Sequence, residues 1–60
     1  MLKEVKDYIA TVKRLQRLGD KILDEYYTNG LQEGVTTDYI SEVECMKEHL
    51  KACLFYLNKQ

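Results

Sequence analysis

Apolar residues recur at helical spacing over two long segments of the chain. Across residues 2–28 and 37–58 they fall three or four positions apart, which places them along one face of an α-helix. Other apolar residues flank each stripe, so both are wider than the seam of a two-stranded coiled coil. The stripes consist of Val5, Tyr8, Val12, Leu15, Gly19, Ile22 and Tyr26, and of Tyr39, Val43, Met46, Leu50, Cys53 and Leu57, with Ile9, Leu23, Ile40 and Leu54 beside them.

The segment between the stripes combines a helix-stop signal with a helix-start signal. Gly30 adopts the left-handed conformation of a helix C-terminus without a Cβ penalty, and Leu31 can fold back on the preceding helix. A threonine hydroxyl then caps the next helix, Asp38 complements its dipole, and Val35 can pack on the first turn. We therefore predict an all-α fold, an antiparallel two-helix hairpin in a single domain over residues 1–60, with a helix over 2–28, a loop over 29–36 and a helix over 37–58.

A lone hairpin of 60 residues is near the lower limit at which a core supports itself. Domains of this size are commonly stabilised by disulfides, by a metal or by self-association. Cys45 and Cys53 lie eight positions apart on one predicted helix, about 12 Å, which is too far for an intrachain disulfide. Because both stripes are wide, we expect the hairpin to dimerise into a four-helix bundle. The predicted seam of the core and the dimer consists of Val5, Tyr8, Val12, Leu15, Ile22, Tyr26, Val43, Met46, Leu50 and Leu57.

Composition narrows the choice of partners and of compartment. The net charge is −1, so no overall attraction to nucleic acid or to an anionic membrane is expected. There is no apolar run of transmembrane length and no apolar run after the charged start, and the cysteines do not form a disulfide framework. We expect a cytoplasmic protein without a membrane partner.

The outer face of the second helix is the first candidate binding surface. Four residues recur there at i, i+4, i+7 and i+11, away from the main stripe, and an aromatic residue lies beside them. A weakly apolar surface of this kind is typical of a protein contact. It is equally consistent with small surface residues and with aromatic rings packed at the helix end. The candidates for partner binding are Cys45, His49, Ala52, Phe55 and Tyr56.

Cys45, His49 and Cys53 also raise the question of a metal site. Neighbours at i and i+4 on a helix can share an ion, but all three cannot reach one ion. A closed site would need ligands from a second copy or from a carboxylate such as Glu48. The favoured interpretation is a core filler (Cys53), a small surface residue (Cys45) and a flanking polar group (His49), so we expect no metal and no cofactor.

Catalysis is not expected either. A thiol and an imidazole on one helix, without a third group to orient them and without a cleft, do not make a nucleophilic site. Gly30 and Gly34 are not followed by the Lys-Ser/Thr of a phosphate-binding loop. The chain is therefore predicted not to be an enzyme.

The middle of the first helix carries the second candidate binding surface, which is basic. Three of its four cations share one face, and a doubled basic face in a dimer suits phosphates or A-form RNA. Asp20 and Asp24 dilute the charge, and a solvated helix surface is the favoured interpretation. The nucleic-acid candidates are Lys13, Arg14, Arg17 and Lys21.

Two further residues of the first helix stand out from the pattern. Gly19 costs helix stability, and the favoured reason is close approach of a facing Tyr or Met, with a kink or hinge as the alternative. Leu18 points away from the stripe and is read as an ordinary exposed leucine.

From these features we expect a small non-enzymatic protein-interaction module. It is a homodimeric helical hairpin that acts as an accessory, adaptor or inhibitory factor on a larger protein. The alternative is an RNA- or DNA-binding regulator that uses the basic face. In size and layout the expected hairpin resembles small plasmid regulators that dimerise as antiparallel helical hairpins and bind paired RNA loops. The likeness involves no sequence motif and implies no role for any individual residue.

Overall fold

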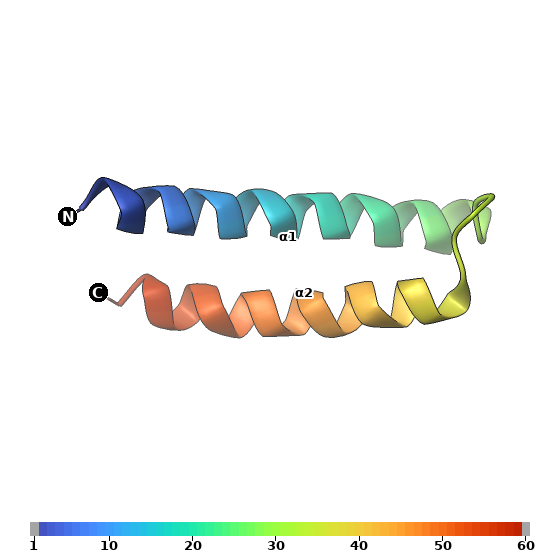
Figure 1. The fold of residues 1–60 in the computed structure, drawn as a ribbon. Coiled ribbons are helices and arrows are strands. Elements are labelled where there is room, and N and C mark those ends of the chain that lie inside the picture. Colours follow the sequence, from blue (N-terminus) through green and yellow to red (C-terminus); the bar gives the residue numbers. More distant parts are fainter. Residues whose placement is uncertain (1, 60) are drawn as a thin grey trace.

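Two helices packed side by side make up the fold. The computed structural model describes residues 2–59, which form helix α1 (Lys3–Asn29), a loop over 30–36 and helix α2 (Thr37–Leu57), without a strand in that range. The helices run in opposite directions, and the start of α1 lies beside the end of α2 (Figure 1). The molecule is a rod of 42 × 17 × 17 Å. The predicted all-α hairpin is confirmed.

Glycines with positive φ shape the loop. Gly30 ends α1 at φ 79° and ψ −166°, and its N–H donates to the Tyr26 carbonyl at 2.8 Å. The positive φ is as expected, but this ψ lies outside the left-handed helical region that the sequence predicts. Gly34 has φ 83° and is the third residue of a turn in which the Val35 N–H donates to the Gln32 carbonyl at 3.0 Å. Residues that carry a Cβ rarely adopt a positive φ. The two glycines therefore allow the chain to reverse direction within a few residues.

A threonine caps the start of α2, as the sequence predicts. The residue is Thr36, whose hydroxyl oxygen accepts a hydrogen bond from the Tyr39 N–H at 3.1 Å. Asp38 lies in the first turn, where its charge complements the helix dipole. Local residue chemistry therefore determines where the second helix begins.

Replacing Thr36 by alanine should lower the free energy of unfolding by about 1 kcal/mol, because the Tyr39 N–H loses its acceptor. Urea denaturation at fixed protein concentration measures the loss. Thr37→Ala is the matched control: it makes the same change one residue later, inside the helix, and should be nearly neutral. Equal losses in the two variants would show that the hydroxyl of Thr36 is not the cap.

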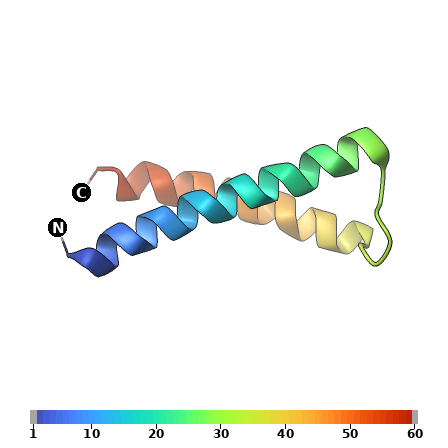
Figure 2. The same ribbon diagram turned by 90° about the horizontal axis from the view of Figure 1, so that it is seen from above.

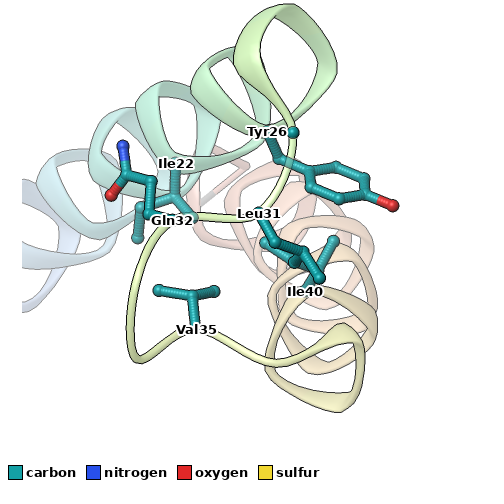
Figure 3. Close-up of a pocket in the computed structure, with 7 residues that line it drawn as sticks. Ile22, Tyr26, Leu31, Gln32, Val35 and Ile40 are labelled. Carbon is teal, nitrogen blue, oxygen red and sulfur yellow. The ribbon is translucent and has the colours of Figure 1, made fainter.

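The loop closes over the end of the core. Leu31 and Val35 from the loop lie against Tyr26 and Ile40 around a small pocket, and the ring of Tyr26 extends outward from it (Figure 3). Ile40 is almost fully buried there. Because Val35 precedes the cap and Ile40 lies in the first turn of α2, their proximity is that of a hydrophobic staple. The loop therefore adds apolar contacts at this end of the hairpin.

The helices cross near their middle (Figure 2). Gly19 of α1 faces Val43 of α2. Helix α1 is continuous through Gly19. A Cβ at this glycine would lie 3.7 Å from Val43 Cγ1, an ordinary van der Waals distance. The facing residue is thus Val43, and the expectation of a tyrosine or methionine there is wrong. Within the hairpin an alanine would fit, so the packing of α1 on α2 does not by itself require the glycine.

The core is small and lies toward one edge of each apolar stripe. Val12, Leu23, Ile40 and Leu50 are the buried apolar side chains in the described part of the chain. Leu23 and Ile40 flank the predicted stripes and yet are the most buried. A single facing helix cannot cover a stripe this wide, so the hairpin covers one edge and leaves the other. Among the predicted seam residues Val12 and Leu50 are buried, Val5, Ile22, Tyr26, Val43 and Leu57 are half-buried, and Tyr8, Leu15 and Met46 are exposed.

Candidate interaction surface

Polar contacts join α1 and α2 along one side of the hairpin. The Lys47 ammonium lies 3.1 Å from Asp20 Oδ1, and the Tyr27 hydroxyl donates to Glu44 at 3.0 Å. The bond to Glu44 raises the pKa of the Tyr27 phenol, and the bond to Asp20 raises the pKa of Lys47. Charged and hydrogen-bonding groups therefore link the two helices on this side of the hairpin.

The other side of the hairpin carries an apolar groove of about 310 Å³. Helix geometry places Leu15 and Ile22, seven residues apart, on one face of α1 and well around the helix from Asp20. Leu15 is 47% exposed and Met46 is 48% exposed, so the groove is open to solvent. The polar side chains in its lining are Gln16 and Lys47. The remaining lining residues are Leu15, Leu18, Gly19 and Ile22 from α1 and Tyr39, Val43, Met46 and Leu50 from α2.

A second apolar depression continues toward the open end of the hairpin. Val5 and Tyr8 from α1 and Leu57 from α2 line it together with Glu4. Tyr8 is 63% exposed. Because Tyr8 and Leu15 are seven residues apart on α1, this depression and the groove lie on the same side of that helix. We call the two together the apolar face.

Three of the four predicted basic residues form a ridge at the edge of the groove. Lys13, Arg14, Arg17 and Lys21 are all exposed. The ridge consists of Arg14, Arg17 and Lys21, which line a shallow depression with Leu18, whereas Lys13 lies outside it. Leu18 also lines the groove, so basic ridge and apolar groove meet at this side chain. Within residues 2–59 the ion pairs are Lys3–Asp7 and Asp20–Lys47, and neither involves the ridge.

Leu18 has a place in the structure that the sequence does not predict. The sequence predicts an ordinary exposed leucine, and the structure shows that Leu18 is exposed and also connects the two surfaces. The signal was present, because Leu18 follows Leu15 by three residues and precedes Ile22 by four. This spacing extends the apolar stripe on the side away from α2.

The outer face of α2 is exposed, but its residues do not share a pocket with the groove. Cys45, His49, Ala52, Phe55 and Tyr56 all face solvent. The rings of Phe55 and Tyr56 meet edge to face at 5.3 Å, and the Lys59 ammonium lies 4.2 Å from the centroid of Phe55. The aromatic residues therefore pack with each other and with Lys59 at the end of α2.

The possible metal ligands are divided between two environments. His49 Nε2 lies 3.6 Å from Cys53 Sγ, whereas Cys45 is exposed, and both cysteines are free thiols. Over the described range no three His, Cys, Asp or Glu side chains come together as metal ligands. The structure thus pairs the histidine with one cysteine.

Neither helix contains an apolar stretch long enough to cross a membrane, as far as residues 2–59 are concerned. Comparison of the chain with protein-family models, with curated proteins and with solved structures finds no match.

Proposed function

We propose that this chain is a non-enzymatic protein-interaction module that acts as a homodimer. Two hairpins pair through their apolar faces to make a four-helix bundle, and the bundle presents its remaining surface to a larger protein. The single observation that carries this proposal is the open apolar groove between α1 and α2. A second copy of the chain is the occupant of the groove, for three reasons.

The first reason is the size of the core. The hairpin buries Val12, Leu23, Ile40 and Leu50, while side chains of similar size stay about half exposed along the groove. A domain of this length is marginal without additional burial. Pairing two apolar faces supplies that burial and leaves no free apolar surface of this kind on either chain.

The second reason is the extent of the face. One long side of the rod measures 42 × 17 Å. Its flat outline is about 700 Å², so a contact along the whole side is of the order of the roughly 800 Å² of accessible surface that each partner buries in an interface of standard size. The exposed parts of Tyr8, Leu15, Tyr39 and Met46 would be anchors along its length. A surface that spans the whole molecule suits a second rod of equal length.

The third reason is charge. At −1 per chain, two copies do not repel each other strongly. The basic ridge borders the groove on α1, and the exposed Glu42 follows Tyr39 by three residues at the α2 border. Placing α1 of one chain on α2 of the other brings borders of opposite charge together, which favours this register.

In such a bundle the outer face of α2 stays exposed in two copies. Cys45, His49, Ala52, Phe55 and Tyr56 are there the candidates for contact with a larger protein, in a cytoplasmic setting. The aromatic pair is the natural anchor, since aromatic rings dominate the energy of many protein contacts. The module then acts as an accessory, adaptor or inhibitory factor.

Sedimentation equilibrium at micromolar concentration tests the dimer. We expect twice the chain mass of 7.1 kDa, with the helical signal and the dimer lost together on dilution. A stable, cooperatively folded monomer over the same concentrations would refute the proposed homodimer.

Nucleic-acid binding is the second candidate function, because the ridge side chains are exposed and take no part in the ion pairs seen between residues 2 and 59. A twofold dimer would present this ridge twice. If the ridge binds phosphates, affinity for bulk RNA should fall steeply between low and moderate salt. An Arg14→Ala/Arg17→Ala double variant should abolish binding, whereas Lys6→Ala should not. Absence of binding at low salt would exclude this candidate.

A further inference from the structure

We propose that Gly19 is the floor of a hole that receives a side chain from the second copy of the chain, and that this side chain is Met46. The contact occurs twice in a twofold dimer, since each chain contributes one hole and one methionine. This inference rests on the proposed homodimer and names the contact that sets how the two apolar faces fit together. It is carried by the cost of the glycine, by the residues around the hole and by the place of Met46 along the rod.

Within the described hairpin, neither the backbone nor the packing requires a glycine at position 19. Helix α1 runs through it without a break, and the positive φ values of the described glycines belong to Gly30 and Gly34. A Cβ at Gly19 would lie 3.7 Å from Val43 Cγ1, which is ordinary contact. Glycine nevertheless weakens the interior of a helix relative to alanine, because it loses more backbone freedom on folding. This cost points to an occupant from outside the hairpin that needs the space.

Gly19 completes a hole of the kind that accepts a side chain from a facing helix. In knobs-into-holes packing each side chain inserts between four residues of the opposite helix. Four residues of α1 stand at i, i+3, i+4 and i+7, the corners of one diamond on the helix surface, and all four line the groove. They are Leu15, Leu18, Gly19 and Ile22. Three corners carry large side chains and the fourth carries none, so the hole is deepest at Gly19.

Met46 lies close to the height of this hole along the rod. Helix α1 has its midpoint at Gln16, three residues or about 4.5 Å from Gly19. Val43 faces Gly19 and α2 runs in the opposite direction, so Met46, three residues beyond Val43, is level with that midpoint. A twofold axis that overlays two rods of equal length places middle upon middle. Met46 of one chain therefore lies within about one helical turn of Gly19 of the other, whether the axis runs along the rod or across it.

The methionine side chain suits the hole. Met46 is 48% exposed in the hairpin, so much of its surface is available to a partner. Its side chain is unbranched and flexible, and such side chains fill irregular gaps. The register in which α1 of one chain lies on α2 of the other brings Met46 to the face of α1 that holds Gly19. Tyr39 is the other exposed α2 residue of the groove, but it lies toward the loop, and an axis across the rod would carry it to the far half of the partner.

Sedimentation equilibrium of Gly19→Ala tests the hole. The added methyl favours the helix, so it would tighten or leave unchanged a dimer that does not use the hole. We expect the reverse, a dissociation constant at least about tenfold higher, because the methyl takes space that Met46 of the second copy fills. Circular dichroism should show that the variant stays helical.

A double-mutant cycle with Met46→Ala identifies the occupant. In the Met46→Ala chain the shorter side chain leaves the hole free, so Gly19→Ala should no longer weaken the dimer. Ala10→Gly is the matched control, because Ala10 is exposed and lies nine residues from Gly19, on the opposite side of α1. Its effect on the dissociation constant should be the same with and without the Met46 side chain. Protein concentration is raised until each variant dimerises.

The outcomes separate this inference from the proposed function. A dimer that Gly19→Ala leaves unchanged or tightens would overturn the hole and leave the homodimer intact. Equal weakening by Gly19→Ala with and without the Met46 side chain would show that Met46 is not the occupant. An unsubstituted chain that stays a folded monomer would remove both the inference and the proposed function.

Discussion

A glutamate in the apolar groove, introduced by Leu15→Glu or Met46→Glu, should convert the proposed dimer into monomer at micromolar concentration. Both side chains are about half exposed in the single hairpin, so a glutamate there meets water and leaves the contacts between α1 and α2 in place. In the bundle the same carboxylate is buried against apolar groups without a partner, which costs several kcal/mol. Twofold symmetry imposes this cost twice, and the dissociation constant should rise at least about a hundredfold, equivalent to about 2.7 kcal/mol.

Sedimentation velocity and circular dichroism measure the effect together. We expect a smaller sedimenting species and a large loss of helical signal, since the separated hairpin has a core of four buried side chains. Tyr56→Glu is the control, because Tyr56 is 67% exposed on the outer face of α2 and lies outside the apolar face. A Leu15→Glu protein that still sediments as the dimer would show that the groove is not the dimer interface.

Replacing a buried leucine by alanine should cause the second large effect, a loss of folding stability. Leu23 is 3% exposed, the lowest exposure among the four core residues, and Leu23→Ala should lower the free energy of unfolding by about 3 kcal/mol per chain. Leu50→Ala should cost about 2–4 kcal/mol for the same reason. Both losses are large beside the few kcal/mol that a core of this size supplies.

Urea denaturation at constant protein concentration is the measurement. Leu2→Ala is the matched control, since it removes the same atoms from a side chain that is 69% exposed, and it should change stability by less than about 0.5 kcal/mol. Lys6→Ala should be similarly neutral. Equal effects of Leu23→Ala and Leu2→Ala would mean that the buried cluster does not hold the helices together.

The features that could be predicted from the sequence are those that depend on near neighbours in the chain. Thr36 caps α2 through an N–H three residues away, and Gly30 ends α1 through a carbonyl four residues back. These interactions are complete once a short segment is formed. The helix bounds accordingly differ by about one residue from the expected 2–28 and 37–58.

The candidate surfaces could be predicted from the sequence only in part. The basic residues and the outer face of α2 were identified as solvent-facing sets by helical spacing. The sequence predicts Leu15, Ile22, Val43, Met46 and Leu50 as seam residues, and all five line the groove. The groove itself does not follow from the sequence, because it depends on which part of α1 lies beside which part of α2. Leu18 illustrates this, since its role appears only when the groove and the ridge are seen to share it.

By itself, the sequence determined the two helices, their caps and the reversal between them, because backbone hydrogen bonding, glycine conformation and apolar period are local properties. Only the tertiary structure decided which edge of each wide stripe is covered. Asp20 with Lys47 and Tyr27 with Glu44 close one side, while Leu15 and Met46 stay open on the other. That choice depends on how two helices cross, and the crossing follows from the shapes and charges of side chains that are distant in the sequence.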